Sequence, residues 1–201
     1  MVGMRFRIAL MAPVAAISLS ACGINSIPTA EEEAKARWAD VQNQYQRRAD
    51  LIPNLVASVQ GAAAQERNVL REVTEARANA TRITVSPEQL RDPEAMRAFS
   101  EAQGRLQSAI IPLQRLQEAY PELKTNQNFL TLQSQLEGTE NRITIARTDY
   151  NRAVQAYNTQ IRTFPAVIGA KVIYGAEPMV PFEATTANAE EAPKVDFGNG
   201  Q

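Results

Sequence analysis

Apolar residues recur at alternating spacings of three and four in three stretches of the chain, as expected for helices that bury one face. In the first stretch the pattern runs from Trp38 to Ile83, with Arg48 and Glu66 at two positions where apolar residues are expected. The spacing averages about 3.5 residues, which is typical of long helices that pack with a slight supercoil. Together with the start signal at Thr29, it predicts one continuous first helix of about 50 residues that reaches Ile83 and is roughly 75 Å long.

Capping residues and prolines mark the ends of the predicted helices. A T-x-x-E capping box at Thr29 predicts the start of the first helix. Pro53 predicts a bend one turn earlier, because proline lacks the amide that would bond the carbonyl four residues before it. Ser86 and Asp92, each followed by proline, are alternative starts of a second helix, which is predicted to end before Pro121.

The third pattern spans residues 129–164, and Pro165 follows it. Residues 169–181 are apolar and rich in β-branched side chains, which predicts a short helix or an extended segment laid against the other helices. Amphipathic helices joined by short loops bury their apolar faces against each other. The predicted fold is therefore all-α, an elongated antiparallel up-down bundle of three long helices over residues 29–181, plus a short fourth helix if residues 169–181 are helical. Residues 182–201 are predicted to be a flexible acidic tail.

The first residues have the pattern of a lipoprotein signal peptide. Arg5 and Arg7 precede an apolar run over residues 8–21, and Cys22 follows at once. As a helix this run would reach about 21 Å, short of the roughly 30 Å hydrocarbon core, which favours a cleaved signal at 1–21 over a membrane-spanning helix. Residues 22–28 would then be a tether.

The sequence Leu-Ser-Ala-Cys at residues 19–22 resembles the bacterial lipobox. It predicts cleavage before Cys22 and acylation of this residue, and two or more acyl chains hold a protein stably at a membrane. The alternative is a secreted soluble protein whose cysteine lies there by chance. Gly23 stands where Asp often retains lipoproteins in the inner membrane, which favours the outer membrane if the organism has one. The predicted location is the cell envelope, outside the cytoplasm.

Composition restricts the chemistry that is available. The chain has no histidine, so the commonest general base and metal ligand is missing, and its one cysteine excludes an internal disulfide or dithiol pair. Neither a phosphate-binding loop nor a nucleophile elbow is present. The net charge of −1, without a basic stripe, gives no basis for binding nucleic acid. We therefore predict no enzyme activity, no cofactor, no metal and no nucleic-acid partner.

The LemA family has a hallmark in which a basic residue precedes D-L-I-P-N-L-V and then E-x-x-x-L-x-x-V-x-x-A-R. This chain resembles it at residues 47–80, which read RRADLIPNLVASVQGAAAQERNVLREVTEARANA. The similarity continues through residues 119–124, 128–130, 140–147 and 191–197, and so covers nearly the whole mature chain. It implies an all-helical antiparallel bundle tethered to a membrane at its N-terminus. Members of the family usually have a longer, uncleaved membrane helix, so the lipobox is a departure that concerns the anchor.

Two groups of polar residues are candidates for function. The first is a candidate partner surface beside Pro53, made of Arg48, Asp50, Asn54 and Glu66. In the alternative interpretation, Arg48 and Glu66 each pair with polar groups of another helix and fix its register. The second group recurs every seven residues and is interpreted as a register-setting polar stripe, or else as a site of ligand recognition: Thr144, Asn151 and Asn158.

These patterns together predict a membrane-anchored, non-enzymatic helical bundle that acts as an envelope scaffold or adaptor for protein partners. The alternative is a ligand-binding module that recognises an envelope lipid or a cell-wall fragment. The sequence leaves the oligomeric state and the identity of the partner open.

Overall fold

Residues 25–183 are described by the computed structural model. The predicted signal peptide, Cys22 and most of the predicted tail lie outside the described residues. Within residues 25–183 the chain forms helices and no strand, which confirms the all-α prediction. The helices are α2 (Ser26–Gln60), α3 (Arg67–Arg82), the 3₁₀ turn η1 (Pro87–Arg91), α4 (Pro93–Ala119), α5 (Pro121–Thr125), α6 (Gln127–Gln160), α7 (Ala166–Gly169) and the π-helical turn η2 (Ala170–Tyr174).

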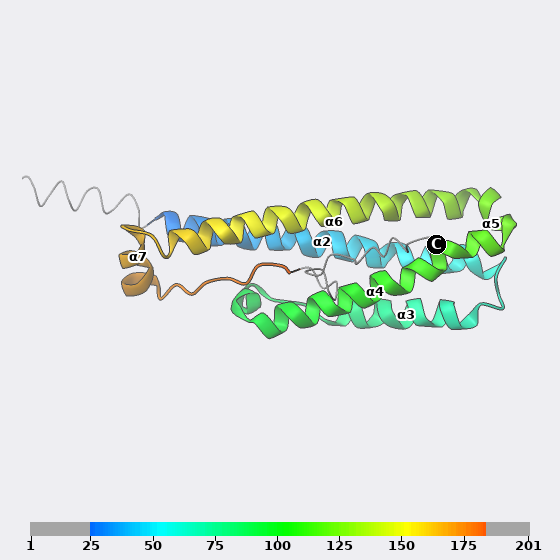
Figure 1. Ribbon diagram of the computed structural model, residues 1–201, viewed down its shortest axis with the longest axis horizontal. Coiled ribbons are helices and arrows are strands. Elements are labelled where there is room, and N and C mark those ends of the chain that lie inside the picture. Colours follow the sequence, from blue (N-terminus) through cyan, green and yellow to red (C-terminus); the bar gives the residue numbers. More distant parts are fainter. Residues whose placement is uncertain (1–24, 184–201) are drawn as a thin grey trace, which may run out of the picture.

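The helices form an elongated bundle (Figure 1). The closest packing is of α2 along α6 and of α3 along α4. The start of α2, the end of α6 and α7 lie together at one end of the bundle, whereas α5 and the connection between α2 and α3 lie at the other end. Among residues 25–183, no helix is long and apolar enough to cross a membrane.

The prediction of one continuous first helix is wrong, because the chain turns back between α2 and α3. A helix over residues 29–83 would extend well beyond α6, which has 34 residues, and would leave its last apolar turns uncovered. Folding back after Gly61 instead buries Leu70, Val73 and Ala80 of α3. The capping box at Thr29 is also wrong, because α2 begins at Ser26 and the Thr29 hydroxyl donates to the carbonyl of Asn25.

The other helix ends follow the capping residues of the sequence. Both alternative starts of the second helix are used, since Ser86 opens η1 and Asp92 caps α4 by accepting the amides of Glu94 and Ala95. As predicted, α4 ends before Pro121. The last long helix, α6, ends at Gln160, a little more than one turn before Pro165 and so earlier than the apolar pattern predicted.

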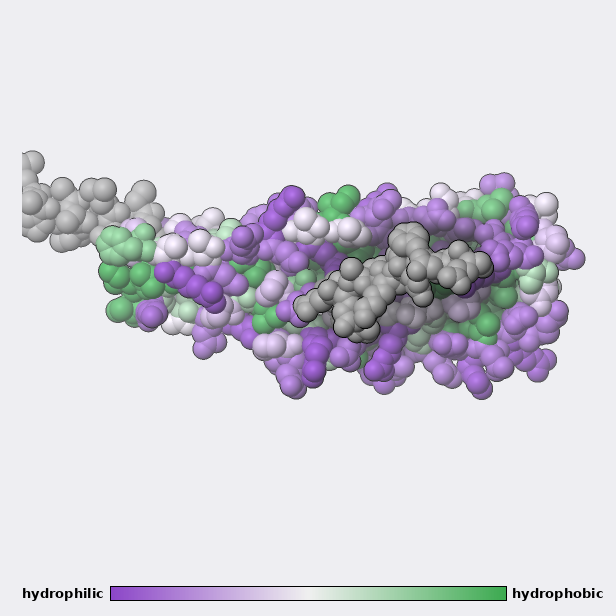
Figure 2. Space-filling view, viewed as in Figure 1, coloured by the Kyte–Doolittle hydropathy of each residue, from purple (hydrophilic) through white to green (hydrophobic). Residues whose placement is uncertain are grey.

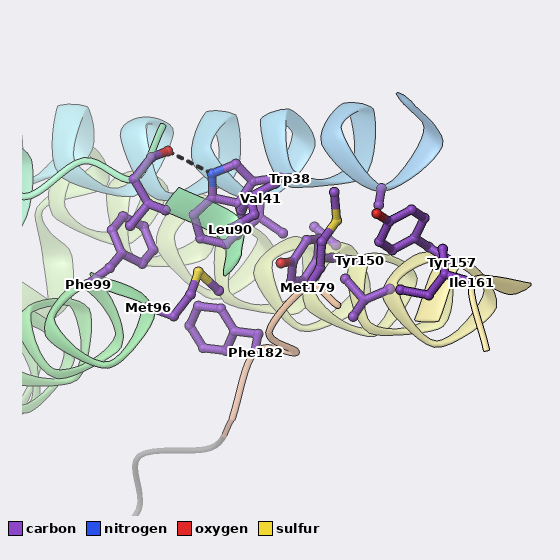
Figure 3. Close-up of a cluster of buried hydrophobic side chains, with 14 of the residues drawn as sticks. Trp38, Val41, Leu90, Met96, Phe99, Tyr150, Tyr157, Ile161, Met179 and Phe182 are labelled. Atoms are coloured by element: carbon purple, nitrogen blue, oxygen red, sulfur yellow. Dashed lines mark hydrogen bonds between the residues drawn. The ribbon is translucent and has the colours of Figure 1, made fainter. Parts of the chain in front are cut away.

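The core consists of two apolar clusters, one in each half of the bundle. The first contains Trp38, whose indole N–H donates to the carbonyl of Val85 at 3.0 Å and whose ring lies edge-on to Phe99 at 5.3 Å. Figure 3 shows that this cluster draws on α2, α4, α6 and the C-terminal segment. The second cluster fills the half near α5, and its large members include Ile52, Leu55, Leu106, Ile110, Leu113, Leu123 and Phe129.

Residues 176–183, here called the C-terminal strap, run in extended conformation back along the bundle. They follow η2 and its C-cap Gly175, a residue in the left-handed region with φ 56° where glycine is favoured. Met179 and Phe182 of the strap are buried in the first cluster. The predicted segment 169–181 is thus helical and then extended, and Phe182, which the sequence assigned to the tail, belongs to the core.

Pro53 leaves the carbonyl of Ala49 without its usual helical donor, and Arg77 of α3 supplies one. The Arg77 Nε donates to the Ala49 oxygen at 2.7 Å, and Ala49 is buried. A side chain of α3 therefore completes the backbone hydrogen bonding of α2.

We expect Arg77→Met to lower the free energy of unfolding by about 2 kcal/mol, because it leaves a buried carbonyl without a donor. In a Pro53→Ala background the amide of residue 53 can bond this carbonyl, so Arg77→Met should cost much less there. Urea unfolding of the four proteins measures both costs. An equal loss of unfolding free energy in the two backgrounds would show that Arg77 does not replace the hydrogen bond that Pro53 removes.

Candidate functional site

A polar layer separates the two apolar clusters. On α2 the buried residues up to Tyr45 belong to the first cluster and those from Ile52 to the second, and Arg48 lies between them. The same change occurs on α4 around Gln103 and on α6 around Thr139. These three polar residues are buried, and Arg48 is only 2% exposed.

The Arg48 guanidinium joins α2 to two other helices. Its Nη2 donates to the carbonyl and the side-chain oxygen of Gln103, at 3.0 and 2.8 Å. Its Nη1 donates to Gln107 Oε1 at 3.1 Å and to Glu140 Oε1 at 3.2 Å. The guanidinium carbon also lies 5.0 Å from the centre of the Tyr45 ring. Four oxygens from α4 and α6 thus compensate the buried charge, as a buried cation requires.

The polar layer also reaches α3. The Gln103 side-chain amide donates to the carbonyl of Ala80, near the end of α3, at 3.2 Å. Gln103 therefore accepts from Arg48 and donates to α3 at once, so the layer links α2, α3, α4 and α6. The remaining donor, Arg48 Nε, is buried and has no partner among residues 25–183.

A cleft of about 800 Å³ opens beside the polar layer. Its walls come from α2, α3, α4, α6 and the strap, and Arg48 lines it from α2. Both carboxylates and guanidinium groups line it, so it offers charged hydrogen-bond acceptors and charged donors. The charged residues that line it are Arg48, Glu72, Glu75, Glu101, Arg105, Glu140 and Arg147. Within residues 25–183, no group of three or more acidic residues is placed to hold a metal ion.

Two asparagines of α6 hold the strap by its backbone. Asn151 donates to the carbonyl of Phe182 at 2.9 Å and accepts its amide at 2.7 Å. Asn158 pairs in the same way with Met179, at 2.8 and 2.9 Å. The two asparagines are seven residues apart on a helix, which is a rise of about 10.5 Å. Their partners are three residues apart in extended chain, which is about 10 Å, so the distance between the asparagines matches the distance between their partners.

A tyrosine precedes each asparagine and adds a third bond to the strap. The Tyr150 hydroxyl donates to the carbonyl of Val180 at 2.8 Å, and the Tyr157 hydroxyl donates to that of Glu177 at 3.1 Å. Burial raises the pKa of Tyr150, so its hydroxyl stays protonated as a donor. The repeated Tyr-Asn pair, seven residues apart on α6, is here called the strap clamp, and it comprises Tyr150, Asn151, Tyr157 and Asn158.

The strap clamp places one wall of the cleft. Phe182 lines the cleft, and the Arg147 guanidinium carbon lies over its ring, 4.2 Å from the centre. Arg147 also donates to the carbonyl of Glu183 at 3.5 Å. The last residues of the strap therefore form part of the wall of the cleft.

Comparison with known proteins identifies the family. The LemA family profile matches residues 37–197, which include the polar layer, the strap clamp and the strap. This chain belongs to the LemA family. Over 174 residues it is 26% identical to magnetosome proteins MamQ 2 and MamQ 1 of Paramagnetospirillum magneticum, and 25% identical to magnetosome protein MamQ of Magnetospirillum gryphiswaldense. These alignments cover 79% of this chain and 64% of each relative, so the chain spans just under two thirds of their length.

The structure of this LemA protein separates the residues that the sequence grouped as a partner surface. Arg48 lines the cleft from within the bundle, whereas Asp50 and Asn54 are exposed on α2 and do not line it. Asp50 accepts from Gln46 of its own helix at 2.8 Å. Glu66 precedes α3, and its carboxylate accepts the Tyr120 hydroxyl at 2.9 Å, which raises the pKa of Tyr120.

The predicted stripe on α6 is divided in the same way. Asn151 and Asn158 bind the strap rather than a neighbouring helix, whereas Thr144 is exposed at the cleft and donates to the Glu140 carbonyl of its own helix. Sequence reasoning did not find the acceptors of Arg48 or the roles of Tyr150 and Tyr157. The repeated Tyr-Asn pair is the signal that could have shown the clamp.

In the LemA protein, Arg48→Met should lower the free energy of unfolding by about 3 kcal/mol, because Gln103, Gln107 and Glu140 lose a charged donor inside the bundle. The control is Arg47→Met at the adjacent, exposed arginine, where a change within about 0.5 kcal/mol is expected. Urea unfolding followed by circular dichroism gives both values. Similar losses at the two positions would contradict the role of the polar layer.

Each of two substitutions, Asn151→Ala and Asn158→Ala, should remove two hydrogen bonds to the strap. In either variant the two lost bonds should lower the free energy of local opening by about 2 kcal/mol. The amides of Met179 and Phe182 should then exchange with solvent about 30-fold faster. Hydrogen exchange measured by NMR tests this, and Asn141→Ala is the matched control because Asn141 is exposed on the same helix. Unchanged exchange in the strap of both variants would rule out the clamp.

Proposed function

We propose that this LemA protein is a membrane-anchored, non-enzymatic scaffold or adaptor that presents its cleft to protein partners in the cell envelope. The observation that carries the proposal is the cleft itself, which is about 800 Å³ in volume and is bordered by exposed charged residues from α3 and α4 and by half-buried ones from α6. Charged rims of this kind orient a partner and select against wrong ones.

The rigidity of the bundle supports the same role. The polar layer ties α2, α3, α4 and α6 together, so the cleft has a fixed shape before a partner arrives. A preformed surface spends little of its binding free energy on ordering its own side chains. The relatives are named for the magnetosome, an assembled structure and not a reaction, which is consistent with a scaffold.

The anchor is proposed from the sequence of residues 1–22. In this proposal, cleavage before Cys22 leaves an acylated cysteine that holds the bundle at a membrane of the envelope, the outer membrane being favoured by Gly23. Only three residues would then separate the anchor from α2, which begins at Ser26. The bundle would stand close to the membrane at the end where α2 starts.

The test is site-specific photocrosslinking in the cell from the cleft. A photoreactive phenylalanine derivative at Arg105, which is exposed and lines the cleft on α4, should crosslink to specific envelope proteins. The control position is Glu118, which is exposed on the same helix outside the cleft. The double variant Glu72→Lys, Glu75→Lys should abolish the crosslinks from residue 105, because it reverses the charge of the facing wall.

Equal crosslinking from both positions, or no crosslinking from the cleft, would contradict the proposed adaptor function.

A second candidate function is the binding of an envelope lipid or a cell-wall fragment. The volume of the cleft is within the range of small-ligand sites, and Arg48 Nε lacks a partner among the described residues, which favours this candidate. That candidate predicts no protein crosslinks from residue 105 and a higher Tm when the fragment is added to purified protein.

A further inference from the structure

The end of the bundle that contains α7 carries a group of exposed apolar side chains. We call this group the apolar tip, and its members are between 41% and 80% exposed: Phe164, Ile168, Val172, Ile173 and Tyr174. They lie on α7, on η2 and in the turn before α7. Figure 2 shows hydrophobic surface gathered at this end of the molecule, where Figure 1 places α7.

The apolar tip differs from the other exposed apolar residues of the described chain. Ile111, Leu130 and Ile145 are exposed one at a time, whereas the five members of the tip fall within residues 164–174. The opposite side of the same segment is buried, since Ala166, Gly169 and Ala170 pack into the bundle. The tip is therefore an ordered projection, and clustered exposed apolar side chains of this kind mark a contact surface.

The apolar tip lies at the end where the chain enters the bundle. The start of α2 and the end of α6 lie beside α7 (Figure 1), and Asn25 and Ser26 border the same hollow as Gln160 at the end of α6. Three residues of chain span at most about 11 Å. An anchor at Cys22 would thus hold the tip within reach of the surface in which the anchor lies.

The charges next to the apolar tip along the chain are mostly basic. Arg162 and Lys171 lie within or beside it, Glu177 follows it as one acidic residue, and all three are exposed. The acidic residues next along α2 are already paired, Glu31 and Glu32 with Lys35, Glu31 also with Arg91, and Glu33 with Arg37. Exposed apolar and aromatic side chains flanked by basic ones are typical of segments that lie in a membrane interface.

We propose that the apolar tip inserts into the interface of the lipid bilayer beside the anchor, with Arg162 and Lys171 at the level of the lipid phosphates. This inference rests on the proposed membrane anchor. Because the tip is at one end of an elongated bundle, its insertion directs the long axis away from the membrane. The cleft is then held off the bilayer, where a partner can reach it.

The test measures the surroundings of the tip in lipid vesicles. The anchored protein, labelled with the fluorophore NBD at Val172→Cys, is reconstituted into vesicles of phosphatidylcholine and phosphatidylglycerol. NBD emission should shift to the blue and be quenched by doxyl-labelled lipids. The matched control is the label at Ile145→Cys, because Ile145 is 61% exposed on α6 and does not belong to the tip; it should show neither effect.

Emission at residue 172 that resembles the control overturns the proposal. A blue shift without doxyl quenching also overturns it, because a second copy of the chain or another protein would then cover the tip.

Flotation of the protein with the vesicles reports the anchor separately. In a second arm, residues 1–21 are replaced by a hexahistidine tag, Cys22→Ser is introduced, and the chain is held on nickel-chelating lipids in the same vesicles. Quenching at residue 172 in this arm supports the tip even if the natural anchor fails to hold the protein. Loss of quenching with flotation intact overturns the tip alone.

Discussion

The structure depends on the compensation of one buried charge. The Arg48 guanidinium lies inside the bundle and is compensated by oxygens of α4 and α6. When apolar residues are spaced by three and four, a shift of one helix by seven residues brings apolar residues into contact again. Apolar contact alone would therefore allow the helices to pack in more than one register. A buried cation removes that freedom, because a slip that leaves its charge unpaired costs more than the apolar contacts regain.

The fixed register determines where the other features lie. It places the two Tyr-Asn pairs of α6 beside the strap at the spacing that an extended chain requires, and the strap in turn brings Phe182 to the wall of the cleft. The same register brings the start of α2 and the end of α6 together, which puts the apolar tip next to the chain entry. The cleft and the tip thus lie at set positions along one rigid body.

The sequence predicted the helical class and both ends of α4 correctly, because apolar spacing, caps and prolines act locally. It missed the reversal after Gly61, because the spacing continues across the turn and the decision to fold back depends on the lengths of partner helices. Arg48 was found as an anomaly in an apolar row, but its acceptors depend on the packing of distant segments. Asp50 was grouped with Arg48 although two residues turn a helix by about 200°, which places them on different faces. The asparagines were found without their partner, since the strap has no periodicity of its own.

The most direct test of this account is the distance between spin labels on α2 and α4, measured by pulsed electron paramagnetic resonance. Labels at Asn43 and Arg115, both exposed, in a Cys22→Ser background report the offset of the two helices. We predict one narrow distance distribution in the otherwise native protein. In Arg48→Met we predict a broadened distribution or a second one, because a slip by one heptad shifts the helices by about 10 Å. An unchanged distribution in Arg48→Met would contradict the claim that the buried guanidinium sets the register.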